Sequence, residues 1–274
     1  MSKKELTILL TNDDGIHSPG LWAAAQILSE LGNLWIAAPD DQYTSAGRSH
    51  SLRAEGSIRP WTEKKGNFTA FAVDGAPAQC IHHGLLEILP CQPDLVVSGI
   101  NSGSNVSVDI TRSGTVGAAL EAANYGIPAL AISLETNDPL DTKDLNEQDY
   151  RGAAYFCRLF AEILAEGSLG EDVQVLKVEV PGNAVHSTPW EISRLSKKSL
   201  YIVKTAERSN LSNPGKLNWK IQPDFSLFKE GTDAHTVFIK EHIAVTPLSL
   251  DMTSRVDLTE LEKKLVHRIL NNNL

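Results

Sequence analysis

Short apolar runs alternate with amphipathic stretches along the first two thirds of the chain. The runs have the length and β-branched content of buried strands, which we predict at 5–11, 33–39, 68–73, 94–100, 128–134 and 173–180. The stretches between them repeat apolar residues at helical spacing and predict helices at 19–31, 76–89, 114–125 and 147–166. This alternation is typical of an α/β fold, and we predict a Rossmann-like, doubly wound, mostly parallel sheet with helices on both faces.

The pattern changes after residue 182. Two segments, 191–204 and 236–246, are predicted as β-structure and are separated by a polar stretch rich in Asn, Ser, Pro and Gly. Residues 257–270 place leucines and isoleucine on one stripe, which predicts an amphipathic terminal helix. We therefore predict a catalytic core over 1–182 and a β-rich, oligomer-forming appendage with a terminal helix over 183–274, within a single domain overall.

Composition excludes several classes of partner. The chain has 25 Lys and Arg against 34 Asp and Glu, a formal net charge of −9, whereas a nucleic-acid-binding protein needs a basic face. Its apolar runs are far shorter than the ~20 residues that cross a bilayer, and its first residues lack the apolar stretch of a signal peptide. The three cysteines form no C-x-x-C pair and are expected to be buried reduced thiols. We expect a cytoplasmic protein that binds neither membrane nor nucleic acid.

The loop after the first predicted strand carries the strongest chemical signal. It reads Thr11-Asn12-Asp13-Asp14-Gly15-Ile16-His17 and therefore places two adjacent carboxylates where the backbone must turn. In open α/β sheets, ligands bind beyond the carboxyl ends of the strands, and clustered carboxylate oxygens suit Mg²⁺ or Mn²⁺. A polar turn closed by glycine explains the same residues about as well.

Three further loops fall at the same predicted edge of the sheet. The loop over 39–51 is rich in hydroxyl groups, and 101–105 begins with the amide of Asn101. Before the helix at 114–125, Ser113 can act as N-cap, and the backbone N–H groups of Ser113, Gly114 and Thr115 can face a phosphate. Each loop alone can be a solvated turn or an ordinary capped helix. Together they predict a metal site and an anion site side by side.

Three motifs resemble one known family. They are Asn12-Asp-Asp-Gly-Ile-His-Ser-Pro-Gly20, Val97-Ser-Gly-Ile-Asn101 and Ser113-Gly-Thr-Val-Gly-Ala-Ala119, and they resemble the survival protein SurE family of 5′-nucleotidases. Segments 74–80 and 243–248 add weaker matches. The resemblance is dense over 5–134, returns near 175–181 and 232–248, and is sparse over 183–231.

The resemblance implies a metal-dependent phosphoric monoester hydrolase with one divalent cation, Mg²⁺ or Mn²⁺, per subunit. Its substrates would be nucleoside 5′-monophosphates, with 3′-monophosphates or short polyphosphate as further candidates. The implied catalytic residues and metal ligands are Asp13, Asp14 and Asn101. A fourth, hydroxyl ligand stays open, because spacing to the loop glycine places Thr44 at that position whereas residue identity favours Ser45.

Several alternatives remain at this level. The attacking group can be a water activated by the cation or one of the aspartates itself. A nucleotide-binding regulatory module without turnover is the competing function. His82 and His83 lie on a predicted helix and are expected to be structural or solvent-facing, while His50 has no assigned role. The resemblance also implies a homodimer or homotetramer whose subunits exchange C-terminal segments.

Overall fold

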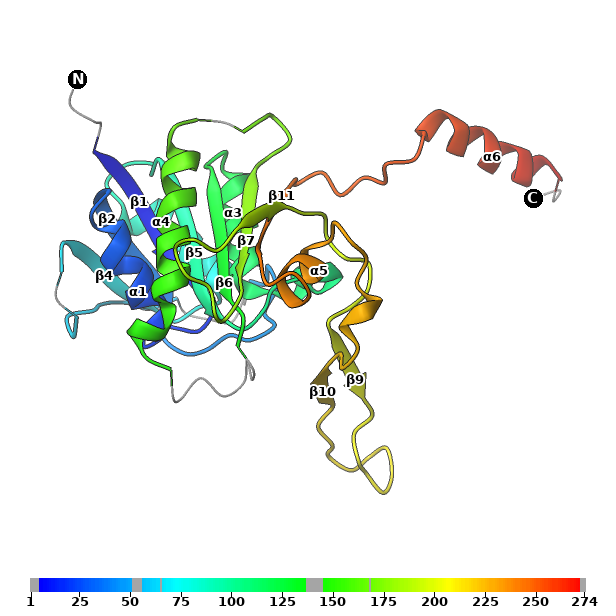
Figure 1. The fold of residues 1–274 in the computed structure, drawn as a ribbon, viewed down its shortest axis with the longest axis horizontal. Helices are drawn as coiled ribbons and strands as arrows, with labels where there is room; N and C mark the ends of the chain where they lie inside the picture. Colours follow the sequence, from blue (N-terminus) through cyan, green and yellow to red (C-terminus); the bar gives the residue numbers. More distant parts are fainter. Residues whose placement is uncertain (1–4, 51–55, 65, 137–144, 168, 272–274) are drawn as a thin grey trace.

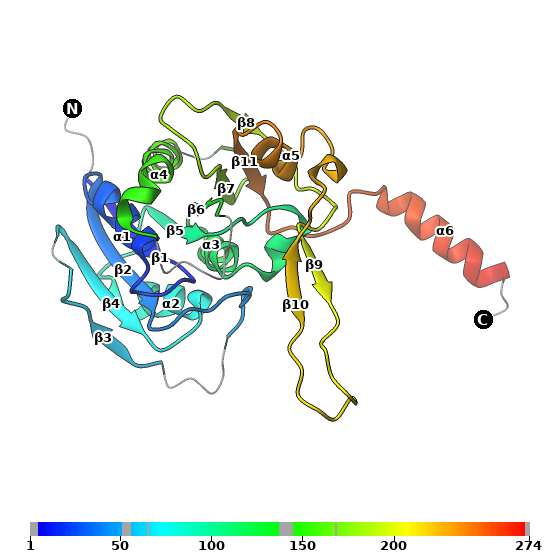
Figure 2. The ribbon, with the colours of Figure 1, turned by 60° about the horizontal axis from the view of Figure 1, so that its bottom comes forward.

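A computed structural model describes residues 5–50, 56–64, 66–136, 145–167 and 169–271 (Figures 1 and 2). Over these ranges the body is built on a nine-stranded sheet of order β3-β4-β2-β1-β5-β6-β7-β11-β8. The bounds of its strands are β1 Leu6–Thr11, β2 Gly32–Pro39, β3 Ile58–Pro60, β4 Phe68–Val73, β5 Leu95–Ser102, β6 Ala129–Leu134, β7 Val175–Val180, β8 Trp190–Ile192 and β11 Ile243–Leu248. The predicted strands of the first two thirds are all present.

Helices cover both faces of this sheet (Figure 1). Helices α1 (Pro19–Leu28) and α4 (Arg151–Ala165) pack on one face, and α2 (Pro77–His83) and α3 (Gly114–Asn124) pack on the other. Strands β4, β2, β1, β5, β6 and β7 are mutually parallel. The chain builds outward from β1 through β2 to β4, then restarts beside β1 with β5. This reversal confirms the predicted doubly wound α/β fold and places its switch point between β1 and β5.

The segment over 236–246 was predicted as β-structure, but only its last part is a strand, so the prediction is wrong for its first part. Residues Asp233–Phe238 form helix α5, and β11 begins at Ile243. The cause is tertiary, because the buried Asp233 carboxylate accepts the backbone N–H groups of Ser107 and Ser196. These contacts outweigh the β-preference of the threonine and valine that follow.

Strand β11 is an interior strand. It pairs antiparallel with β7 on one side and parallel with β8 on the other, so its edges are covered. The domain boundary after residue 182 stays a prediction, since residues beyond it contribute both to this central sheet and to two projecting parts.

A hairpin and a helix project from the body (Figure 2). Strands β9 (Tyr201–Lys204) and β10 (Asn218–Ile221) form an antiparallel ribbon, and helix α6 (Leu258–Asn271) extends from the far end. Every described residue of α6 is exposed, including its predicted apolar stripe. Within the described ranges, no helix has the length and apolar character needed to span a membrane. Cys80 and Cys157 are buried free thiols, whereas Cys91 is free but exposed, so burial was wrongly expected for Cys91.

Candidate functional site

A cavity of about 620 Å³ opens at the carboxyl ends of β1 and β5, the switch point of the sheet. We call it the switch-point cavity. The loops after β1, β2 and β5 and the residue before α3 line one part of it, contributing Asp13, Asp14, Gln42, Thr44, Ser45, Asn101, Ser102 and Ser113. The hairpin and the residues that precede α3 line the rest, contributing Asp109, Arg112, Tyr201, Lys216, Trp219 and Lys220. The four loops chosen from the sequence therefore meet at one place.

Asp13 lies at the N-terminus of α3. The Thr115 hydroxyl donates to its Oδ1 at 2.6 Å, and the side chain is buried. Burial raises the pKa of Asp13, although the Thr115 hydroxyl and the backbone N–H groups of Thr115 and Gly114 oppose that rise. A Cβ on Gly114 would fall 2.7 Å from the Asp13 Cβ, so this approach requires glycine.

Asp14 is held from the two neighbouring loops. The backbone N–H of Ser102 donates to Oδ2 at 2.9 Å, and Gln42 Nε2 donates to Oδ1 at 3.2 Å. Burial, together with the charge of Asp13, raises the pKa of Asp14 to about 7. Two carboxylates that disfavour each other's ionisation form a site in which a cation would stabilise both charges.

Asn101 and two hydroxyl residues complete the oxygen-rich side. Asn101 Nδ2 donates to the carbonyl of Gly103 at 2.6 Å, so the amide Oδ1 is the atom that would coordinate a cation. Thr44 and Ser45 both line the cavity, and Ser45 has a left-handed backbone with φ of 61°. The choice of hydroxyl ligand between them stays a prediction.

The predicted phosphate-binding residues divide into two groups. Ser113 lines the cavity and caps α3, since its Oγ accepts the Val116 N–H at 3.1 Å. Gly114 and Thr115 instead direct their donors at the Asp13 carboxylate. The helix N-terminus therefore acts on a side chain of the site, an arrangement that the spacing of the motif does not indicate.

The hairpin contributes residues that the sequence analysis did not select. The Arg112 guanidinium lies 4.5 Å from the Trp219 ring centroid and pairs with Asp109 at 2.5 Å. Asp109 also accepts the Ser199 hydroxyl and the Leu200 N–H, so it fixes the base of the hairpin beside α3. The signal available in the sequence was a tryptophan between basic residues at 216–220, but nothing local indicates that this segment reaches the β1 edge.

The histidine next to the acidic pair has a packing role. His17 contacts Trp61 edge-on, with ring centroids 4.8 Å apart, and it is not among the described residues that line the cavity. His83 pairs with Glu87 at the surface, whereas His82 contacts the buried Glu121.

Fold and site together define a class: a doubly wound α/β protein with an oxygen-donor site of paired aspartates, amide and hydroxyl at its switch point. The sequence profile of a family described as "Survival protein SurE" matches residues 8–201. The chain belongs to the survival protein SurE family.

Individual relatives agree with this assignment. The chain is 38% identical to the 5′-nucleotidase SurE of Methanosarcina mazei over 264 residues, covering 94% of this chain and 97% of that protein. It is also 38% identical to the protein of the same name from Thermococcus gammatolerans, covering 95% and 96%. The crystal structure of the Sure protein from Aquifex aeolicus matches with a TM-score of 0.73 at 30% identity, covering 90% of this chain and 95% of that one. The predicted family, fold and enzyme class, a phosphoric monoester hydrolase, are thereby confirmed.

Proposed function

We propose that this protein hydrolyses nucleoside 5′-monophosphates to nucleoside and phosphate with the help of one divalent cation per subunit. The observation that carries the proposal is the meeting of Asp13, Asp14 and Asn101 in one cavity that basic and aromatic side chains also line. The relatives named 5′-nucleotidase SurE support the reaction type.

The side chains of the site fit a hard cation. The candidate ligands are carboxylate, amide and hydroxyl oxygens from Asp13, Asp14, Asn101 and either Thr44 or Ser45, a set that suits Mg²⁺ or Mn²⁺. Burial and the Asp13 charge raise the pKa of Asp14 because they destabilise its ionised form, and a bound cation would offset that destabilisation. When bound, the cation supplies Lewis-acid neutralisation of phosphoryl charge.

The protein's own groups position the reactants. Donors from α3 hold Asp13, and Ser102 with Gln42 hold Asp14, so the carboxylates need no reorganisation during the reaction. Because both carboxylates are engaged as acceptors, they are better suited to orient an attacking water than to attack phosphorus. Attack by water forms the new P–O bond as the ester P–O bond breaks. One proton of that water ends on the leaving ester oxygen, so the products are the nucleoside alcohol and phosphate.

The basic and aromatic residues that line the same cavity suit the rest of the nucleotide. Arg112, Lys216 and Lys220 line this cavity and can offset the dianionic charge of a phosphate monoester. Trp219 also lines the cavity and is partly exposed, and its ring offers a stacking surface for a nucleobase. A site with both features favours nucleotides over simple phosphate esters.

Phosphate release from AMP tests the proposal. Chelator-treated enzyme should release no phosphate until Mg²⁺ or Mn²⁺ is added, and 3′-AMP and short polyphosphate test the wider substrate range in the same assay. AMP binding measured by calorimetry, without phosphate release in either metal, would favour the competing function of a regulatory nucleotide-binding module.

Assembly and location complete the proposal. The exposed apolar stripe of α6 supports a homodimer or homotetramer, and three free cysteines support a reducing, cytoplasmic environment. The formal net charge of −9 is consistent with a small-molecule partner rather than a nucleic acid.

A further inference from the structure

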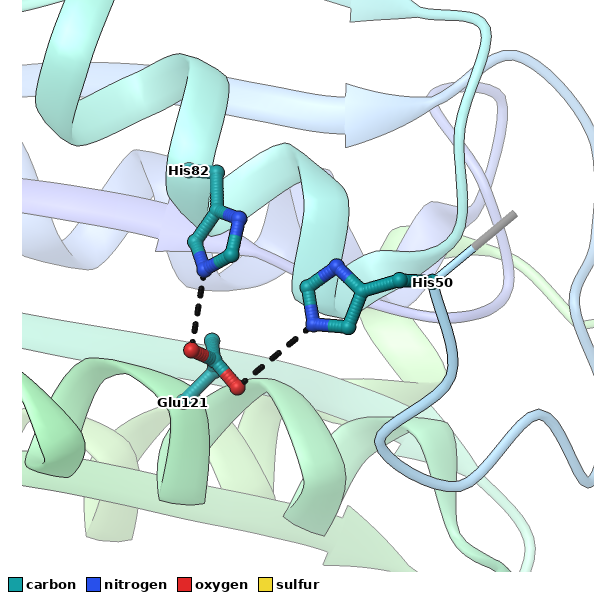
Figure 3. Close-up of side chains that lie close together, drawn as sticks. All are labelled: His50, His82 and Glu121. Carbon is teal, nitrogen blue, oxygen red and sulfur yellow. Dashed lines mark hydrogen bonds and ion pairs between the residues drawn. The ribbon is translucent and has the colours of Figure 1, made fainter. Parts of the chain in front are cut away.

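Two histidines and a glutamate converge where α2 and the loop after β2 meet α3 (Figure 3), and none of the three lines the switch-point cavity. His50 comes from the loop after β2, His82 from α2 and Glu121 from α3. One potential ligand atom from each residue lies within 4.8 Å of the others. We call these three residues the His/Glu cluster.

The carboxylate of the cluster is held in its ionised form. The Glu121 side chain is only 5% exposed, and burial alone would raise its pKa. Hydrogen bonds from Arg48 and His82 outweigh burial and leave the pKa of Glu121 below its ordinary value. A nearly buried negative charge therefore faces two imidazole rings.

The spacing within the cluster fits a shared cation. The His50 and His82 rings are stacked, with centroids 4.6 Å apart, and the Nε2 atoms of both rings face the Glu121 carboxylate. His50 Nε2 lies 3.7 Å from Oε2, which is too long for a hydrogen bond. Two ligands bonded to one Zn²⁺ at about 2.0–2.2 Å each lie about 3.4 Å apart in tetrahedral geometry. The His82–Glu121 contact of 2.9 Å would have to open by about half an ångström to reach that spacing.

We propose that the His/Glu cluster binds a borderline divalent transition cation, with Zn²⁺ as the matching ion. Two imidazole nitrogens and one carboxylate oxygen favour Zn²⁺ over Mg²⁺ or Mn²⁺, which prefer the all-oxygen set in the switch-point cavity. His82 faces Oε1 of Glu121 and His50 faces Oε2, so the carboxylate lies between both rings, and Arg48, which contacts Oε2, orients it from outside.

Such a site would restrain the loop over 40–50, which contributes to the switch-point cavity. The loop from 40 to 50 carries Thr44 and Ser45 at the switch-point cavity and ends at His50. Backbone hydrogen bonds join it to neighbouring elements at Asp40, Tyr43 and Gly47, whose N–H groups donate to the carbonyls of Val73, Asp13 and Arg112. Zn²⁺ at the His/Glu cluster adds a bond from the same loop to both α2 and α3. The cation therefore stabilises the protein without taking part in phosphate release.

Zn²⁺ titration of full-length protein tests the proposal. Chelator-treated protein carrying Asp14→Asn, which weakens the oxygen-donor site, is titrated with Zn²⁺ by calorimetry. We expect one Zn²⁺ per chain. Adding His50→Ala or His82→Ala should lower Zn²⁺ affinity by more than the about 10- to 100-fold that loss of an outer partner costs. His83→Ala is the matched control, because His83 lies next to His82 on α2 and pairs with Glu87 instead.

Two additional measurements exclude misfolding and indirect effects. Co²⁺ in place of Zn²⁺ should give a visible absorption band that His82→Ala abolishes and His83→Ala retains, with circular dichroism confirming the fold of each variant. In the otherwise wild-type chain, His82→Ala should keep phosphate release in Mg²⁺ while losing the rise in melting temperature that Zn²⁺ produces. Equal Zn²⁺ affinity in the three histidine variants, or no Zn²⁺ binding at all, would overturn the proposal and leave an ion-paired packing cluster.

Discussion

Asp13 is the residue on which the proposed chemistry depends most. Asp13→Asn removes one negative charge from the oxygen-donor site but leaves the volume of a buried side chain unchanged. We expect Mg²⁺- or Mn²⁺-dependent phosphate release from AMP to fall by at least about 100-fold, more than the loss of an outer-shell partner, with little change in melting temperature. The exposed Asp41, on the adjacent loop, supplies the control variant Asp41→Asn. Normal turnover in a folded Asp13→Asn protein would remove Asp13 from the site.

Thr44 and Ser45 can be separated by one pair of variants. Ser45 is best replaced by glycine, because its φ of 61° would strain an alanine, and Thr44→Val keeps the shape while removing the hydroxyl. The variant that loses the ligand should need a higher Mg²⁺ or Mn²⁺ concentration for half-maximal phosphate release. The other variant should match wild type. If neither changes the metal requirement, the loop hydroxyls do not bind the cation.

Residues that follow a strand could be found from the sequence, and residues joined only by packing could not. Asp13 and Asp14 follow β1, Asn101 lies at the end of β5, and the carboxyl ends of parallel strands meet at one edge. His50, His82 and Glu121 belong to three separate elements and meet only because α2 packs beside α3. No spacing along the chain encodes that contact.

The hairpin β9–β10 is an element with a predicted role in substrate selection. Trp219→Ala removes the proposed stacking surface in the switch-point cavity. A stacked base is worth about 1–3 kcal/mol, so KM for AMP should rise roughly tenfold. KM for a simple alkyl phosphate, which has no ring to stack, should change little. Trp190→Ala provides the control, since Trp190 is an exposed tryptophan on β8 outside the cavity. A parallel rise in KM for both substrates would argue against base stacking.

Strand β7 carries a buried charge network that makes stability depend on pH. Lys177 pairs with Asp233 of α5 at 3.2 Å, and Glu179 Oε2 accepts the Asn105 N–H at 3.0 Å. Burial raises the pKa of Glu179 from 4.5 to about 7, although Lys177 opposes the rise. The folded state therefore binds the proton more tightly than the unfolded state. The stabilisation is fully present below pH 4.5 and is lost as pH rises through 7.

Urea unfolding of wild type and Glu179→Gln at pH 5 and pH 8 measures this effect. Between these pH values the unfolding free energy of wild type should fall relative to that of the variant by up to about 3 kcal/mol, because glutamine does not titrate. The comparison with Glu179→Gln cancels other groups that titrate over the same range, Asp14 among them. A difference between the two proteins that is independent of pH would show that Glu179 does not titrate there.

Elements with a strong local pattern were predictable, and elements set by distant contacts were not. The fully buried β5 begins with the apolar run Leu95-Val-Val97, and α3 begins after its capping serine as expected. Helix α5 was mistaken for a strand because Thr236 and Val237 are β-branched, while the contacts of Asp233 that stabilise the helix come from β7 and two loops. Strand β10 was missed because its four residues are mostly exposed and become regular only by pairing with β9.

At the scale of the whole molecule, the exposed apolar stripe of α6 indicates that subunits assemble into an oligomer. Its apolar residues Leu258, Leu261, Leu265 and Ile269 are all more than 40% exposed, a stripe that a partner subunit would cover. Light scattering of the full-length protein should give a mass above one 29.8 kDa chain. A chain ending at Leu250 retains β11 and should be a folded monomer.

A pair of double variants separates the stripe from the length of the helix. Leu261→Ser with Leu265→Ser should weaken assembly, whereas Glu262→Ser with Lys263→Ser should not, because both pairs lower helix propensity but only the first removes apolar area. A full-length protein that is monomeric at micromolar concentration with normal phosphate release would contradict the predicted homodimer or homotetramer.

The position of β11 between β7 and β8 governs when the protein can finish folding. On a ribosome, β7 emerges more than sixty residues before the strand that covers it, since β7 ends at Val180 and β11 begins at Ile243. Until then, the edge of β7 is open and Lys177 lacks the carboxylate of Asp233. The nascent chain therefore depends on protection from aggregation during this interval. We expect a premature stop codon in that interval to yield an aggregation-prone, rapidly degraded fragment rather than a smaller active enzyme.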